Sequence, residues 1–220
     1  MGTSIQVSEV SLFSKNEDPI FRNLNFSVPE QIISNIILSD RQKIDALLEI
    51  LIGEKKPDRG QVLVAGRNVV RSSEKNLLEM RKKDIGFVPR NFKLPFKTVK
   101  ETLNFKMRCI GTPYDTDNKI EEALKRVGLK EKGEYENTEL TQLERVKLAF
   151  ALALVNKPRL LISNQPFKQL EDGEREEILQ ILQNYCERGK MTVVIATETP
   201  LEEDSVRKID LSGTSSSDSL

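Results

Sequence analysis

Hydrophobic and polar positions change their period several times along the chain, from the alternation of strands to the repeat of helices. Leu24, Phe26 and Val28 alternate with polar residues, as in a half-buried strand, and a second apolar run covers residues 32–38. Apolar residues at positions 44, 47, 48 and 51 then share one helical face, and Gly53 marks the predicted end of that helix. Residues 61–65 form the next predicted strand.

The second half of the chain begins with a helical pattern that runs from about residue 99 to residue 155. An apolar face at positions 120, 123, 124 and 127 stops at Gly128, and Thr141 with Glu144 fits a capping box that opens a further helix. A buried strand at 160–163, a helix around 178–185 and a β-branched strand at 191–196 follow. Because strands alternate with helices, we expect an α/β fold with a mainly parallel sheet.

Composition narrows the classes of function. The 220 residues, of which 38% are hydrophobic, suffice for a domain with a substantial core. Lys plus Arg equals Asp plus Glu at 34 each, so no excess of charge predicts a nucleic-acid partner. No apolar run approaches the roughly 18–20 residues that span a bilayer, and no signal peptide is recognised. The absence of histidine removes the commonest metal ligand, and no metal site is expected. Cys109 and Cys186 are predicted to be free thiols in a reducing cytoplasm.

Four strings carry a resemblance to a known family: residues 56–62 (KPDRGQV), 84–89 (DIGFVP), 155–161 (VNKPRLL) and 192–197 (TVVIAT). Their order and spacing resemble an ABC-transporter ATP-binding subunit along almost the whole chain, most similar to the FtsE, LolD and MacB class. The resemblance implies a P-loop NTPase-like (RecA-like) core with a mainly parallel sheet, an antiparallel β-subdomain and a helical subdomain. We expect the core at 1–89 and 156–211, the helical subdomain at 90–155 and a flexible polar tail at 212–220.

The stretch that corresponds to the phosphate-binding loop, residues 38–45, departs from the family pattern GxxxxGK(S/T). By the resemblance, Leu38 and Lys43 replace glycines, Ile44 replaces the phosphate-binding lysine and Asp45 replaces the hydroxyl that holds Mg²⁺. A loop without glycine does not easily adopt the positive φ of an anion-binding nest, and a carboxylate competes with phosphate for the positive end of the helix dipole. We predict an ordinary capped turn, with weak anion binding as the alternative.

Other family positions are also replaced. Asn164 and Gln165 stand where the family has Asp-Glu. The first lacks a charged oxygen for the water shell of Mg²⁺, and the second cannot accept a proton from attacking water. Thr141 and Gln142 lie in the stretch LTQLE, where the family signature reads LSGGE. The capping box gives this stretch a structural role.

Two further positions carry a charge in place of a neutral or switchable group. Arg90 replaces the glutamine of the Q-loop, and Glu198 replaces the switch histidine, where a carboxylate would repel a γ-phosphate. From all these replacements the sequence predicts no nucleotide cofactor and no ATP hydrolysis, that is, a pseudo-ATPase with a degenerate P-loop that is not an enzyme.

The segment of residues 90–96 is the predicted partner-binding surface. By the resemblance it lines the cleft that receives the permease, and Arg90, Phe92, Leu94 and Phe96 suit the docking of an amphipathic helix. The alternative is that Phe92 and Phe96 anchor the loop to its own domain.

The sequence therefore favours a catalytically inactive subunit that docks as a scaffold on a membrane permease of the cell-division or lipoprotein-release type. It would lie at the cytoplasmic face of the membrane, as a homodimer or as a heterodimer with another ABC subunit. A regulatory or assembly scaffold without a permease and a residual nucleotide sensor are the alternatives. Thermal stabilisation by Mg²⁺ and nucleotide would favour the sensor.

Overall fold

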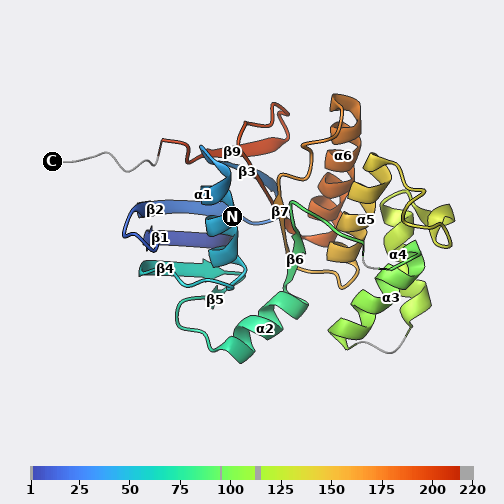
Figure 1. The fold of residues 1–220 in the computed structure, drawn as a ribbon, viewed down its shortest axis with the longest axis horizontal. Coiled ribbons are helices and arrows are strands. Elements are labelled where there is room, and N and C mark those ends of the chain that lie inside the picture. Colours follow the sequence, from blue (N-terminus) through green and yellow to red (C-terminus); the bar gives the residue numbers. More distant parts are fainter. Residues whose placement is uncertain (1, 95, 112–114, 214–220) are drawn as a thin grey trace.

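Two sheets organise the chain in the computed structural model, which describes residues 2–94, 96–111 and 115–213 (Figure 1). One sheet is antiparallel with the strand order β2-β1-β4-β5, and the other is parallel with the order β6-β7-β8-β3-β9. The antiparallel strands are β1 Thr3–Phe13, β2 Pro19–Pro29, β4 Arg59–Val64 and β5 Arg67–Asn68. The parallel strands are β3 Ile33–Ile37, β6 Ile85–Val88, β7 Leu160–Asn164, β8 Thr192–Thr197 and β9 Val206–Asp210.

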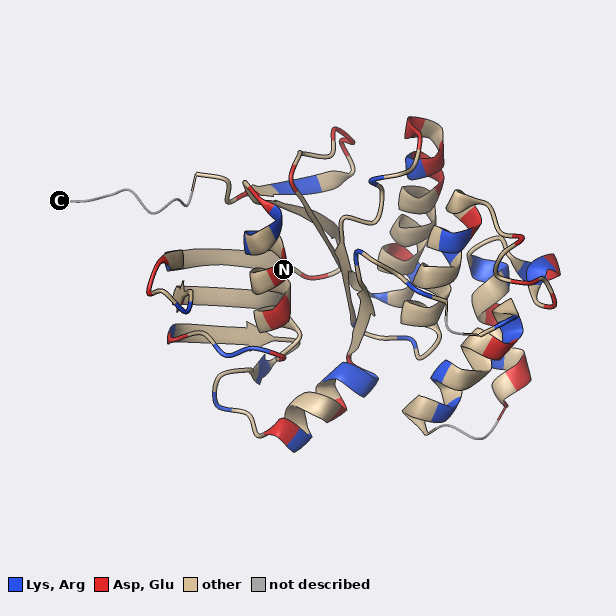
Figure 2. Cartoon of the chain, in the orientation of Figure 1, with Lys and Arg blue, Asp and Glu red and all other residues tan. Residues whose placement is uncertain are grey.

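Helices lie on both faces of the parallel sheet. The helices of the described residues are α1 Arg41–Leu51, α2 Glu74–Lys83, α3 Val99–Ile110, α4 Thr116–Arg126, α5 Gln142–Leu154 and α6 Asp172–Gly189, with a short 3-10 turn at Lys130–Lys132. Figure 1 shows α1 between the two sheets, α5 and α6 on the opposite face of the parallel sheet, and α3 and α4 farther out. Acidic and basic residues are interspersed over the helices and loops, while the strands are mostly uncharged (Figure 2).

Three apolar clusters follow this arrangement. The first joins the antiparallel sheet, α1 and one face of the parallel sheet, and it contains Phe21, Ile44 and Ile162. The second lies between the other face of the parallel sheet and helices α5 and α6. The third joins α3, α4 and α5 around Leu103 and Leu148. Helices α3 and α4 bury one apolar stripe each, whereas α5 is buried on all sides over residues 147–154 and joins the second and third clusters.

The predicted fold class is confirmed, and the strands and helices expected from periodicity overlap the observed ones, with the helical stretch of 99–155 divided into α3, α4 and α5. The capping box at Thr141 is present at the start of α5. Strands β1, β5, β6 and β9 and helix α2 were not predicted. The division into a core and a helical subdomain stays a prediction, and residues 214–220 of the predicted tail lie outside the described residues. No helix in the described ranges has both the length and the apolarity to cross a membrane.

Glycines in two of the family-like strings are required by close packing. Gly60 has φ +94°, and a Cβ there would lie 2.5 Å from the carbonyl oxygen of Glu9 on the neighbouring strand. A Cβ on Gly86 in β6 would lie 2.4 Å from the carbonyl oxygen of Ala153 in α5. Any side chain would force these backbones apart, so both strings keep glycine for the fold.

Candidate functional site

The carboxyl ends of three parallel strands meet at one edge of the sheet. Ile37 of β3 pairs with Thr197 of β8, and Asn164 of β7 pairs with Ala196 of the same strand. The segments that follow these strands are therefore neighbours, and they carry most of the positions singled out in the sequence. Ligands of open α/β sheets bind at this edge, so we take it as the candidate site.

The turn between β3 and α1 is closed by its own side chains. The Leu38 N–H donates to the Thr197 carbonyl at 3.1 Å, and Leu38 is fully buried. Asp40 is the N-cap of α1, and its carboxylate accepts the Lys43 N–H at 2.9 Å. The Lys43 ammonium donates to the Ser39 hydroxyl at 3.2 Å and lies 4.0 Å from the Asp40 carboxylate. This is the capped turn that the sequence predicts.

Positions 44 and 45 of this turn face different surroundings. The Ile44 side chain has no exposed surface and packs in the first apolar cluster. Asp45 points the other way: its Oδ1 accepts the Asn164 side-chain amide at 2.7 Å, and its Oδ2 lies 3.4 Å from Arg41 Nε. The carboxylate at position 45 is thus paired with the side-chain amide nitrogen at position 164, so the two replaced positions bind each other.

A second pair joins the ends of β7 and β8. Gln165 has φ +46°, in the left-handed region, and its side-chain amide donates to Glu198 Oε1 at 2.8 Å. The same carboxylate oxygen lies 4.0 Å from Arg90 Nη1. Arg90 Nη1 and Asn164 Oδ1 are buried without a hydrogen-bond partner among the described residues. Side chains from three motif positions therefore form one polar network.

Asn35 is a supporting residue that the sequence analysis did not single out. It is fully buried in β3, and its amide donates to the Ile195 carbonyl at 2.9 Å and to the Thr197 hydroxyl at 2.7 Å. Its Oδ1 accepts the Leu201 N–H at 2.9 Å. Asn35 thus fixes the end of β8, which positions Glu198. The signal in the sequence is a lone amide inside the apolar run of residues 32–38.

Thr141 and Gln142 lie apart from this edge, at the exposed start of α5. The Glu144 carboxylate accepts the Thr141 N–H at 2.9 Å, and the Thr141 hydroxyl accepts the Glu144 N–H at 3.2 Å. The first of these bonds, with help from Lys132, lowers the pKa of Glu144 below its ordinary value. In the described part of the chain, no hydrogen bond or ion pair joins this capping box to the groups around Asp45 or Glu198.

The segment after β6 combines anchored and exposed residues. Phe92 is half-buried against the second and third clusters, and Leu94 packs against the third. The Phe96 ring lies 4.8 Å from the ring of Phe105, which is 44% exposed. Pro95 lies outside the described residues. Phe105 was missed in the sequence, although it falls off the buried stripe of α3.

Comparisons with known proteins identify the family of this chain. The family model described as ABC transporter matches residues 46–168. The cell division ATP-binding protein FtsE of Streptococcus pneumoniae is 30% identical over 88% of this chain and 84% of its own length. The lipoprotein-releasing system ATP-binding protein LolD of Bacteroides fragilis is 28% identical, with 81% and 83% covered. The ATP-binding protein YtrE of Bacillus subtilis is 26% identical, with 83% and 80% covered. The chain belongs to the ABC transporter family.

Solved structures agree with this fold. The dimeric structure of MJ0796, a bacterial ABC transporter cassette, superimposes with a TM-score of 0.77 at 24% identity over 89% of this chain and 88% of that one. The cbiO1 subunit of Clostridium perfringens gives a TM-score of 0.83 at 21% identity, with 90% and 80% covered.

The family implies Mg²⁺ and ATP at this edge, and the side chains present do not fit them in the family's manner. Asp40 covers the N-terminus of α1, Ile44 is in the core, and Asp45 already accepts a hydrogen bond from Asn164. We therefore derive no catalytic step from this geometry.

The prediction that the chain is not an enzyme is contradicted by the comparisons. The chain belongs to a family of ATP-hydrolysing enzymes, and the relatives that match most of its length are named as ATP-binding proteins. The prediction rested on residue replacements alone. Since the replacements at positions 44, 45, 164, 165 and 198 are accommodated by local pairing and packing, they describe how this site is built and do not by themselves remove the chain from that class.

Proposed function

We propose that this chain is the cassette subunit of an ABC transporter of the cell-division or lipoprotein-release type. In this proposal it docks on a membrane permease at the cytoplasmic face and serves there as a scaffold. The matches to FtsE and LolD along most of the chain support the type of transporter. The side chains around α3 support docking on a permease, and they are the main observation behind the proposal.

The supporting observation is an aromatic pair at α3: Phe96 lies just before the helix, and Phe105 lies on it. The rings of Phe96 and Phe105 contact each other and stay partly open to solvent. Beside them, Phe96, Glu101, Asn104 and Arg108 line a hollow of about 400 Å³. Aromatic residues with an adjacent arginine are enriched where proteins bind each other. An amphipathic helix of a permease could bury both rings in such a surface.

The backbone around this surface is held in place before any partner binds. The Asn137 amide donates to the Phe96 carbonyl at 2.6 Å and to the Thr102 hydroxyl at 3.0 Å. Thr98 and Glu101 form a capping box that fixes the start of α3. A surface that is already ordered loses less conformational entropy on binding, which favours association.

In this proposal the docking residues have two different roles. Phe92 and Leu94 pack against the chain's own clusters, so they support the segment from beneath. Phe96 and its neighbour Phe105 present the apolar surface. Arg90 lies 17% exposed at the back of the segment, close to Glu198, so it would link the docking segment to the candidate site.

A second copy of a cassette subunit is also part of the proposal. The related cassette MJ0796 is described as dimeric. We propose that this chain pairs with itself or with another ABC subunit when it is docked.

Affinity purification from detergent-solubilised membranes tests the proposal. The unmodified chain is expected to retain a polytopic membrane protein. The double variant Phe96→Ala/Phe105→Ala should lose it by about 30-fold or more, since truncated hot-spot residues cost about 2 kcal/mol or more. Leu78→Ala is the matched control, because Leu78 is 45% exposed on α2, away from this surface. Retention of the partner by the double variant, with an unchanged thermal midpoint, would contradict docking at α3. Recovery of only non-membrane partners would favour the scaffold without a permease.

A further inference from the structure

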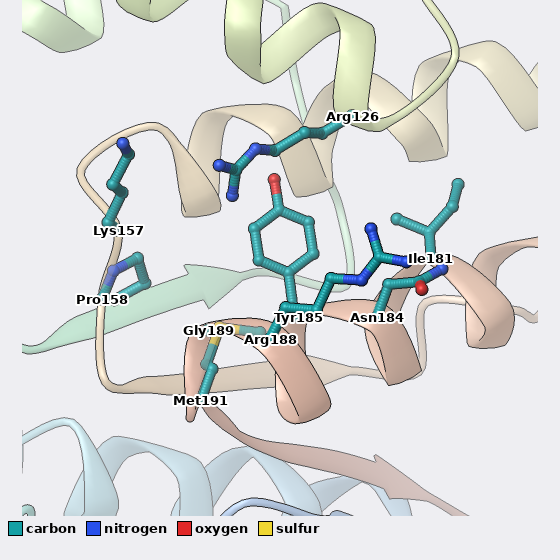
Figure 3. A pocket seen from close by; sticks show the side chains of 9 residues that line it. All are labelled: Arg126, Lys157, Pro158, Ile181, Asn184, Tyr185, Arg188, Gly189 and Met191. Atoms are coloured by element: carbon teal, nitrogen blue, oxygen red, sulfur yellow. The ribbon is translucent and has the colours of Figure 1, made fainter.

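A second cavity lies at the opposite end of the parallel sheet from the candidate site. Two of its lining residues precede strands: Pro158 lies two residues before β7, and Met191 lies directly before β8. The remaining walls come from the end of α4 and the last turns of α6, and the cavity volume is about 610 Å³ (Figure 3). This size is in the range of small-molecule sites.

The lining of this cavity is basic. Arg126, Lys157 and Arg188 line it, and none of its lining residues, all within the described ranges, is acidic. Arg126 and Lys157 share a single carboxylate, that of Glu122, which lies 3.2 Å from the Lys157 ammonium. Arg188 forms no ion pair among the described residues. Three cations therefore face one carboxylate, which leaves a surplus of positive charge.

Tyr185 stands in the middle of the cavity, with its hydroxyl directed toward Arg126 (Figure 3). The Arg126 guanidinium carbon lies 5.4 Å from the centre of the tyrosine ring, a cation–π contact that holds the arginine over the ring. A tyrosine hydroxyl carries its proton at neutral pH and can donate a hydrogen bond, and burial raises the pKa of Tyr185 further. Ile181 and Met191 add apolar wall next to the ring.

We propose that this cavity binds an organic phosphate monoester, whose phosphate contacts Arg126 and Lys157 and whose apolar part lies against Tyr185 and Met191. Arg188, on the other side of Tyr185 from Lys157 (Figure 3), adds positive charge without contacting the phosphate. A phosphate monoester carries about 1.5 to 2 negative charges at neutral pH, which matches the surplus of positive charge in the lining. Guanidinium groups bind phosphate oxygens through paired hydrogen bonds. The apolar wall distinguishes such a ligand from inorganic phosphate.

The test is an NMR titration of the full chain with phenyl phosphate as the probe. Saturable shifts are expected at the backbone amides of residues 126, 157 and 189. Arg126→Gln and Lys157→Gln should each weaken binding about tenfold, as expected for a lost hydrogen bond to a charged group, and Arg188→Gln should weaken it less. Lys125→Gln is the matched control, since it removes the same charge from the neighbouring position of α4 and does not line the cavity. It should leave the affinity unchanged.

Two results would overturn the proposal. One is the absence of saturable shifts at these amides, which would leave Arg126 and Arg188 as partners of their own helix ends. The other is an equal loss of affinity in Lys125→Gln, which would show that binding depends on the net charge of the chain and not on the cavity. Inorganic phosphate should bind more weakly than phenyl phosphate, and equal affinity would contradict the role of Tyr185 and Met191. Competition by phosphatidic acid vesicles, and none by phosphatidylcholine vesicles, would support a lipid headgroup as the phosphate source, whereas no competition would support a soluble ligand.

Discussion

The carboxyl edge of the parallel sheet and the outer face of α3 differ in how their side chains are partnered. At the sheet edge, Asp45 pairs with Asn164 and Gln165 pairs with Glu198. At α3, the rings of Phe96 and Phe105 contact each other, and Phe105 is 44% exposed. The first region pairs most of its polar groups with one another, Arg90 Nη1 and Asn164 Oδ1 excepted, while the second leaves apolar surface uncovered. Free capacity to bind a macromolecule thus lies on α3, and this is why the proposal places the partner there.

Ile44→Lys should have the largest effect on the sheet edge. The Ile44 side chain is fully buried in the first cluster, so a lysine would place an ammonium without a partner in apolar surroundings. We expect a loss of about 4 kcal/mol or more in the free energy of unfolding, measured by urea denaturation. Lys43→Met is the control one position earlier, where only the contacts with Ser39 and Asp40 are lost, and it should cost less than about 1 kcal/mol. Equal stability of the two variants would show that position 44 is not in the core.

Asn164→Asp tests the first polar pair at the sheet edge. It would set two carboxylates about where the 2.7 Å hydrogen bond now lies, and we expect a loss of roughly 2 kcal/mol at neutral pH. Acidification should recover part of the loss, because protonation of one carboxyl removes the repulsion. The exchange variant Asn164→Asp/Asp45→Asn restores an amide–carboxylate pair and should regain most of the stability. If Asn164→Asp alone were as stable as the parent, the hydrogen bond between Asp45 and Asn164 would contribute nothing to the free energy of unfolding.

Thr141→Ala is expected to have the smallest effect of the three. Loss of the N-cap of α5 should cost about 1 kcal/mol. The pKa of Glu144 is lowered in the folded chain. The ionised carboxylate therefore contributes to the free energy of unfolding above the ordinary pKa of 4.5, and this contribution is lost as the pH falls through the lowered pKa. The difference between parent and variant should therefore shrink in acid. Gln142→Ala, one residue farther on, is the control and should be nearly neutral. A difference that does not change with pH would refute the role of Glu144.

Much of the fold was accessible from the sequence because periodicity reports burial directly. The apolar run at 32–38 and the helical face at 44–51 correspond to β3 and α1, and Thr141 with Glu144 forms the predicted capping box. Strand β1 escaped prediction, since Glu9 at φ +54° interrupts its pairing register with both neighbours. Helix α2 is strongly polar and buries only Leu77 and Met80, which leaves little periodic signal.

The candidate site was harder to predict, because its character depends on partners far apart in the chain. The motif positions predicted which residues lie at the site but not which of them pair. Asn164 and Asp45, for example, are 119 positions apart in the sequence and form a hydrogen bond. Asn35 and Phe105 acquire their roles only when β8 and the segment after β6 pack beside them. The step from replaced residues to a chain without enzymatic activity was the wrong one, since family membership outweighs an interpretation of single positions.

Photo-crosslinking from position 105 tests the central proposal most directly. A photoreactive phenylalanine analogue would replace Phe105 in one version of the chain and Leu78 in another, since both side chains are comparably exposed on different helices. The account predicts that position 105 crosslinks in intact cells to a polytopic membrane protein and that position 78 does not. Crosslinks to that protein from both positions alike, or from neither, would contradict docking through the face of α3.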